Sequence, residues 1–144
     1  MTLTPRILLV DDDPNDVAIA QLAFEWSGLH EDLAVAHDGL DALEYLRRTG
    51  THQHRPVGSP HLVLLDLNMP RVDGFDVLRT VRHDDALVHI PIVVFTTSDA
   101  QRDRVRCNDL GADDYLIKPS GIEQFLTIIG DLTSRWLRDD SVAM

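Results

Sequence analysis

The chain has 144 residues, the length of one ordinary domain, and carries a formal net charge of −11 at pH 7. Hydrophobic residues make up 44% and charged residues 26%, which excludes a disordered or fibrous protein. The acidic charge and the scattered basic residues argue against nucleic acid and membrane surfaces as partners.

The sequence favours a single cytoplasmic domain. Cys107 is the only cysteine, so the chain can form no internal disulfide. No secretory signal precedes the first apolar run, and every apolar run is far shorter than the ~20 residues of a membrane helix. We therefore expect one domain over residues 1–144, with its core within about 6–137 and no output domain.

Five short apolar runs alternate along the chain with five segments of helical spacing. The runs are 7–10, 33–36, 62–65, 92–95 and 115–117, of which 33–36 is the weakest. The helical segments are 16–27, 40–48, 75–82, 100–110 and 122–137. Because the runs are rich in Val, Ile and Leu without polar alternation, they predict strands buried on both faces of a parallel sheet.

The alternation predicts an α/β fold, a doubly wound (βα)5 parallel sheet of the flavodoxin-like kind with right-handed crossovers. We predict the strand order 2-1-3-4-5, because this order covers both faces of the sheet evenly with helices. The first and third strands are then neighbours whose connections leave in opposite directions. Ligands of such sheets bind at the carboxyl ends of the strands at that point.

Acidic residues follow the first and third predicted strands. Asp11, Asp12 and Asp13 come directly after the first strand, and Asp66 comes directly after the third. These carboxylates should meet in one crevice, where like charges destabilise the fold unless a cation neutralises them. Oxygen ligands that leave room for water and phosphate suit Mg²⁺. For Asp13 we favour capping of the following helix over metal binding.

A hydroxyl and an ammonium group are expected at the same edge of the sheet. Thr96 ends the fourth strand, and Lys118 follows the fifth. A carboxylate, a metal, a hydroxyl and an ammonium are the parts that aspartyl-phosphate chemistry requires. Asp66 would attack phosphorus in line, while Mg²⁺ and Lys118 would draw charge from the phosphoryl oxygens.

Five stretches of the sequence are specific enough to indicate a family. They are 7–14 (ILLVDDDP), 64–70 (LLDLNMP), 73–74 (DG), 91–96 (PIVVFT) and 111–119 (GADDYLIKP). Together they resemble the receiver domain of bacterial response regulators, from about Arg6 to Leu137. The long polar loop at 49–61, to which we assign no metal chemistry, and the expected lack of an output domain make the chain similar to stand-alone receivers that serve bacterial phytochrome kinases.

The resemblance implies a stand-alone response regulator of a two-component phosphorelay. Asp66 would accept a phosphoryl group from a sensor histidine kinase, and the chain would catalyse only its own phosphorylation and dephosphorylation. The ligands of Mg²⁺ (or Mn²⁺) would be Asp11, Asp12, Asp66 and the backbone carbonyl of Asn68. No further cofactor is expected.

The resemblance also assigns roles to the ends of the last two strands. Thr96 would move toward the phosphoryl group, Lys118 would pair with that group, and the rotamer of Tyr115 would follow Thr96. Packing in the core is an equally good interpretation of Tyr115. The bond from Lys118 to Pro119 is expected to be cis. Thr97 departs from the Ala, Gly or Ser of most receivers, and its methyl group should restrict access of water and small phosphodonors.

The apolar patterns of two predicted helices indicate surfaces that bind partner proteins. In the first helix, Ile19, Leu22 and Trp26 fall away from the face expected on the sheet, and we expect this surface to dock the kinase. In the last helix, Ile128 and Leu132 widen the apolar stripe on one flank and Leu137 widens it on the other, beyond what a sheet requires. We therefore predict a homodimer through the fourth helix, fifth strand and fifth helix, with charged partners chosen from Arg102, Arg104, Arg106, Asp113, Asp114 and Asp131.

Three alternatives remain open at this point. A non-phosphorylated pseudo-receiver, which acts by contacts alone, would form no acid-stable phosphoryl adduct with any kinase. A haloacid-dehalogenase-like phosphatase would use Asp11 and Asp13, but Asn15 stands where that family expects Thr or Val. A flavodoxin-like FMN binder needs a hydroxyl-rich phosphate loop, and the carboxylates after the first strand would repel its phosphate.

Overall fold

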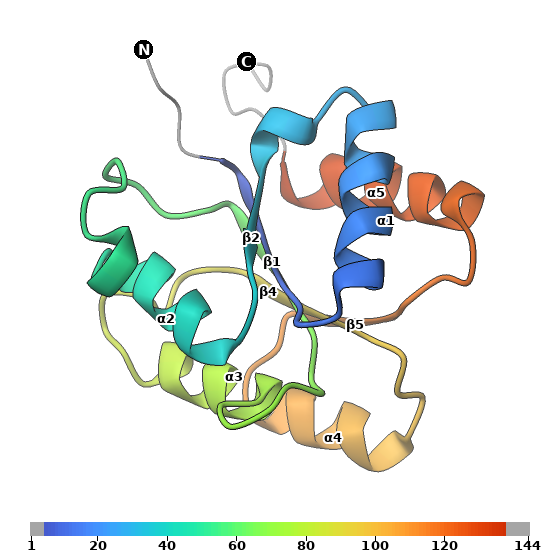
Figure 1. The fold of residues 1–144 in the computed structure, drawn as a ribbon. Coiled ribbons are helices and arrows are strands. Elements are labelled where there is room, and N and C mark those ends of the chain that lie inside the picture. Colours follow the sequence, from blue (N-terminus) through green and yellow to red (C-terminus); the bar gives the residue numbers. More distant parts are fainter. Residues whose placement is uncertain (1–4, 138–144) are drawn as a thin grey trace, which may run out of the picture.

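The computed structural model describes residues 5–137 and places a parallel sheet between two layers of helices (Figure 1). Its elements are β1 (Ile7–Val10), α1 (Pro14–Trp26), β2 (Leu33–Ala36), α2 (Gly39–Arg47), β3 (Leu62–Leu65), α3 (Gly74–Arg82), β4 (Ile92–Thr96), α4 (Gln101–Asp109), β5 (Asp114–Ile117) and α5 (Ile122–Trp136). Short 3-10 turns lie at His30–Asp32 and Gly50–His52. Each predicted strand and helix is present, with ends that differ by no more than two residues.

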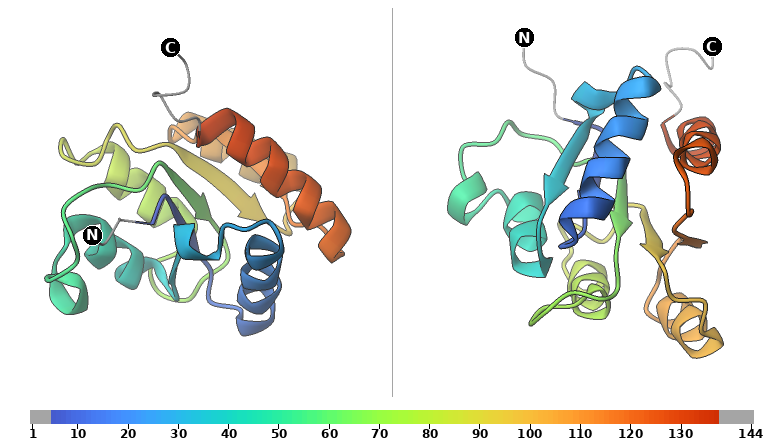
Figure 2. Two further views of the ribbon diagram at one scale, coloured as in Figure 1. Left: turned by 90° about the horizontal axis from the view of Figure 1, so that it is seen from above. Right: turned by 45° about the vertical axis from the view of Figure 1, so that its right-hand side comes forward.

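The sheet has five strands in the order β2-β1-β3-β4-β5, and all the pairings are parallel, which confirms the predicted topology. Helices α1 and α5 cover one face, while α2, α3 and α4 cover the other (Figure 2). In the register of β1 with β3, Val10 is the partner of Leu65. The residues that follow, Asp11 and Asp66, therefore leave the sheet at the same edge.

The central strands hold this edge rigidly, because both of their faces are buried. In β1, Leu8 and Val10 pack into the core under α2 and α3, while Ile7 and Leu9 pack into the core under α1 and α5. Side chains of a strand alternate between the faces, so burial on both faces explains the unbroken apolar run. Burial of each such side chain contributes about 1.5–3 kcal/mol.

An aspartate caps each of the first three helices. The side chain of Asp13 accepts hydrogen bonds from the backbone N–H groups of Asn15 and Asp16, which confirms its predicted role as the cap of α1. In α2 and α3, the side chains of Asp38 and Asp73 each accept one hydrogen bond from a backbone N–H of the first turn. All three helices thus begin at the edge of the sheet where the strands end.

The loop at 49–61 folds back on α2. His52 Nε2 lies 2.6 Å from Asp41 Oδ1, and the Arg55 guanidinium stacks on the Tyr45 ring at 4.2 Å. Within residues 5–137, the acidic group after β1 and β3 is where three potential metal-ligand side chains converge, and no loop histidine takes part in such a group.

The exposed face of α1 is as predicted. Ile19, Leu22 and Trp26 are 44%, 40% and 61% exposed, whereas Val17 and Phe24 are buried against the sheet. These three side chains are spaced by three and four residues, so they form one apolar stripe along the helix. No helix in the described part of the chain is long and apolar enough to span a membrane.

The predicted face of α5 needs a correction. Leu132 and Leu137 were expected on the two flanks of the apolar stripe, but they are 1% and 3% exposed and belong to the core with Phe125 and Ile129. Leu132 comes three residues after Ile129 and seven after Phe125, which is the spacing of one helix face, so it faces inward with them. Ile128 remains half-buried on the flank.

Gly74 allows α3 to begin directly against the backbone that follows β3. A Cβ atom at this position would overlap the carbonyl oxygen of Asp66 and would lie 2.7 Å from Leu67 Cα. We expect Gly74→Ala to lower the free energy of unfolding by about 1–3 kcal/mol, because backbone must move to relieve the overlap. The loss is to be measured as a lower midpoint of urea unfolding.

Gly130 provides the matched control. It lies in α5, and a Cβ atom there would meet nothing within 4 Å. Gly130→Ala should raise the free energy of unfolding by about 0.5–1 kcal/mol, since alanine favours the helix interior. A Gly74→Ala protein as stable as the wild type would contradict the close packing of α3 on the Asp66 backbone.

Candidate functional site

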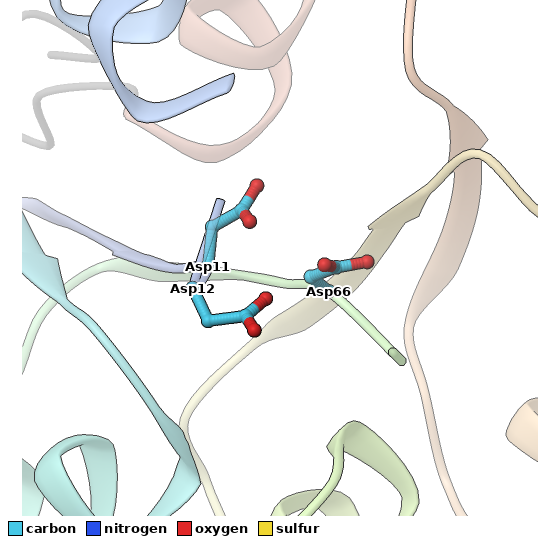
Figure 3. A group of neighbouring side chains, drawn as sticks. All are labelled: Asp11, Asp12 and Asp66. Atoms are coloured by element: carbon cyan, nitrogen blue, oxygen red, sulfur yellow. The ribbon is translucent and has the colours of Figure 1, made fainter. Parts of the chain in front are cut away.

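Three carboxylates converge where β1 and β3 end (Figure 3). Asp11, Asp12 and Asp66 each offer one oxygen, and these oxygens lie within 4.8 Å of one another. Asp11 and Asp66 are buried, at 2% and 6% exposure, while Asp12 is exposed. The crevice is therefore acidic and open to solvent on the side of Asp12.

The Asp66 carboxylate has an unusual ionisation. Burial raises the pKa of Asp66 to about 6, against the charge of Lys118, which lowers it, while the charge of Asp11 raises it further. The backbone N–H of Asn68 donates to the carboxylate and acts in the lowering direction. An ionised Asp66 at neutral pH is thus a charge that the folded protein holds at a cost.

Lys118, which directly follows β5, compensates part of this negative charge. Its Nζ donates to Asp11 Oδ2 at 2.7 Å and to Asp16 Oδ2 at 2.9 Å, and it lies 3.5 Å from Asp66 Oδ2. Burial lowers the pKa of Lys118, but the bonds to Asp11 and Asp16 and the charge of Asp66 outweigh burial and hold the pKa above its ordinary value. The ammonium group therefore stays charged.

The Lys118–Pro119 peptide bond is trans, so the prediction of a cis bond is wrong. The trans form is the more favourable one for a bond before proline, by about 0.5–1 kcal/mol. The long side chain of Lys118 reaches the carboxylates from this backbone, as its bond to Asp11 demonstrates.

Thr96 and Tyr115 are linked through the loop between β4 and α4. Thr96 is fully buried, and its Oγ1 accepts a hydrogen bond of 3.4 Å from the N–H of Ser98. The Tyr115 hydroxyl donates to the carbonyl of Ser98 at 2.8 Å, and the Arg104 guanidinium lies 4.6 Å from the centre of the Tyr115 ring. Tyr115 thus packs against the core and also holds this loop.

The structure brings together most residues that the sequence singled out. Asp11, Asp12 and Asp66 share the crevice with Lys118, whereas Asp13 turns to its helix. The charges of the crevice suit a divalent cation, because buried and clustered carboxylate oxygens favour a hard ion that neutralises them. The metal role of the Asn68 carbonyl stays a prediction.

Sequence reasoning missed Asp16 and Ser98. Asp16 stands at the start of α1, where an acidic residue is usual for helix stability, so nothing marked it as a partner of Lys118. The part of Ser98 that binds Tyr115 is a backbone carbonyl, which every residue has. A side-chain pattern contains no signal for that contact.

Comparisons with known proteins agree with this geometry. Residues 7–130 match the family described as response regulator receiver domain. Response regulator Rcp1 of Synechocystis sp. (strain ATCC 27184 / PCC 6803 / Kazusa) is 34% identical over 91% of this chain and 88% of its own. The Mn²⁺-bound structure of Rcp1 has a TM-score of 0.79, with coverage of 92% and 94%.

Two further solved structures are similar. The phosphorylated cyanobacterial phytochrome response regulator RcpA is 32% identical, with a TM-score of 0.83 and coverage of 94% of this chain and 95% of its own. The bacteriophytochrome response regulator AtBRR is 44% identical, with a TM-score of 0.76 and coverage of 90% and 93%. The chain spans about half the length of the transcriptional regulators among its relatives.

The ionisation of Asp66 predicts how stability depends on pH in metal-free protein. The folded-state pKa of about 6 lies above the ordinary value of 3.8, so the stability from this group is present below pH 4 and is lost as the pH rises through 6. Asp66→Asn removes the ionisation. We expect the variant to be more stable than the wild type above pH 7, by about 2–3 kcal/mol.

Urea unfolding in the presence of a chelator, from pH 3.5 to 8, measures this difference. The advantage of Asp66→Asn should shrink below pH 4 and should also shrink when Mg²⁺ is added to both proteins at pH 7.5. A difference in stability that is independent of pH would contradict the buried, cation-free carboxylate as its cause.

Proposed function

The chain belongs to the response regulator receiver domain family, and we propose that Asp66 is the residue that takes a phosphoryl group from a histidine kinase. As a receiver domain, the chain is a phosphoacceptor in two-component signalling and not an enzyme with a separate substrate. One observation carries the choice of Asp66. Its buried carboxylate, with a pKa of about 6, lies beside Asp11 and the Lys118 ammonium.

In the proposed transfer, an ionised oxygen of Asp66 attacks the phosphorus of a phosphohistidine in line. The phosphorus–oxygen bond forms as the phosphorus–nitrogen bond breaks, and the departing imidazole keeps the electron pair and takes a proton from water. Lys118 lies 3.5 Å from Asp66, so its ammonium is placed to donate to a phosphoryl oxygen. The hydroxyl of Thr96 is the second donor that we assign to this group.

We propose Mg²⁺ or Mn²⁺ as the cation at the three carboxylates. Asp11, Asp12 and Asp66 would each give one oxygen, and the backbone carbonyl of Asn68 would complete the ligands from the protein. When bound, the ion would neutralise the clustered charge and withdraw charge from the phosphoryl oxygens. The relative Rcp1, whose solved form is described as Mn²⁺-bound, supports the choice.

We propose that Thr96 and Tyr115 carry the signal to the surface. The N–H of Ser98 donates to Thr96, and the carbonyl of Ser98 accepts from Tyr115. A movement of Thr96 toward a phosphoryl group would therefore disturb the bond that holds Tyr115. This switch separates the phosphoacceptor from the pseudo-receiver alternative, which needs neither group.

We further propose that the kinase is a bacterial phytochrome and that both proteins act in the cytoplasm. Two relatives, RcpA and AtBRR, are described as phytochrome response regulators and support the choice of kinase. The apolar stripe of Ile19, Leu22 and Trp26 is the surface that we assign to the kinase, because α1 begins directly after the acidic crevice.

The proposed homodimer uses α4, β5 and α5. This face offers Val105 on α4, which is 49% exposed, and the half-buried Ile128 on α5. Acidic side chains that the sequence made available for the dimer already have partners within the chain: Asp113 pairs with Arg82, and Asp114 and Asp131 pair with Arg135. The dimer would therefore depend on apolar contacts more than on new ion pairs.

Phosphotransfer from a purified histidine kinase tests the main proposal. We expect Asp66→Asn to abolish the acid-stable, base-labile label, because the variant lacks the carboxylate oxygen that would form the bond to phosphorus. Asp12→Ala should weaken Mg²⁺ binding by about tenfold or more, as it removes an oxygen ligand. Asp13→Asn, which keeps the helix cap, should label normally. Undiminished labelling of Asp66→Asn would overturn the assignment.

Sedimentation velocity at micromolar concentration tests the dimer. We expect the wild type to dimerise when beryllium fluoride mimics the phosphoryl group, and Ile128→Asp to weaken association by about tenfold or more. Leu22→Asp, a change of the same kind on α1, should leave association unchanged. Monomers with and without beryllium fluoride would refute the dimer, and a dimer untouched by Ile128→Asp and by Val105→Asp would refute this interface.

A further inference from the structure

The first three helices begin with the same pattern of two aspartates, and only Asp16 of α1 departs from the others in its hydrogen bonds. Each has an aspartate at its cap and another three residues later, and the later ones are Asp16, Asp41 and Asp76. In α2 and α3 this second aspartate turns back to accept a hydrogen bond from the backbone before the helix. Asp41 accepts from the N–H of His37, and Asp76 accepts from the N–H of Asp73.

In α1, the side chain of Asp16 does not bind the backbone N–H of the cap residue. The backbone N–H of its cap residue, Asp13, donates instead to Asp11 Oδ1 at 3.0 Å. The side chain of Asp16 extends across the crevice and accepts a hydrogen bond of 2.9 Å from the Nζ of Lys118. The equivalent aspartates of α2 and α3 bind backbone N–H groups, whereas Asp16 binds the ammonium group of Lys118.

Lys118 is nearly buried, at 8% exposure of its side chain, so it depends on partners from the protein. Two of its three carboxylate partners, Asp11 and Asp66, belong to the proposed metal ligands, and Asp66 also receives the phosphoryl group. A cation bound to Asp11 and Asp66 would compete with Lys118 for these two carboxylates. Asp16 lies outside the cluster of metal ligands and has no such competitor.

We propose that Asp16 is a positioning residue that holds the Lys118 ammonium in the crevice while Asp11 and Asp66 bind the metal and the phosphoryl group. The inference rests on the proposed function. Without Asp16, the metal ligands would be the remaining partners of Lys118, and the ammonium would compete more strongly with a cation. Asp16→Asn should therefore weaken metal binding, and this loss should depend on the presence of Lys118.

Calorimetric titration of the unphosphorylated protein with Mg²⁺, and with Mn²⁺, measures this effect without phosphotransfer. We expect the affinity of Asp16→Asn to be lower than that of the wild type by about three- to tenfold. Asp16→Glu should restore most of the affinity, because its carboxylate can still reach Lys118. Asp41→Asn, the same change at the equivalent position of α2, should bind the metal as the wild type does.

A double-mutant cycle with Lys118→Met decides whether Asp16 acts through Lys118. In the Lys118→Met background, Asp16→Asn should change the affinity by less than about twofold. The same loss in both backgrounds, or no loss in either, would overturn the inference while leaving the proposed function intact. A wild type that binds neither ion would overturn both.

Discussion

The parallel pairing of β1 with β3 forces two carboxylates together at the edge of the sheet. Val10 and Leu65 are partners in the register, so Asp11 and Asp66 leave the sheet side by side, and both are buried. The surrounding core is apolar on both faces and holds the strands in place. The sheet fixes the backbone positions of both residues, so the other charged groups of the crevice have to compensate two neighbouring buried carboxylates.

In the metal-free protein, the negative charges of the crevice are only partly compensated. Lys118 gives one positive charge to Asp11, Asp16 and Asp66, while Asp12 adds a further negative one at the open side. Burial is the main cause of the raised pKa of Asp66, and the charge of Lys118 lowers this pKa without restoring its ordinary value. In the proposed function, a divalent cation would neutralise the excess negative charge and would let an anionic phosphoryl group approach. The clustered and largely buried carboxylates therefore cause both the cost of ionising Asp66 and the affinity for a cation that the proposed phosphotransfer requires.

The sequence was sufficient for the fold because strand and helix signals rarely conflict along this chain. The strands are short apolar runs between helical segments, and the carboxylates after β1 and β3 followed from the strand order. On two helices the interpretation of the sequence was wrong or incomplete. The spacing of Leu132, three residues after Ile129 and seven after Phe125, already places it on the buried face of α5, so its burial was predictable. Asp16 could cap its helix or reach Lys118, and that depended on which partner the N–H of Asp13 found.

The edge strand β5 explains why the signal would leave on that side of the molecule. The central strands β1, β3 and β4 are buried throughout, whereas every residue of β5 is half-buried. Lys118 directly follows β5, and its backbone N–H donates to the carbonyl of Thr96 at 2.8 Å. Tyr115 lies on the same strand and holds Ser98, with Arg104 over its ring. In the proposed switch, a change at Asp66 would reach solvent through this half-buried edge strand.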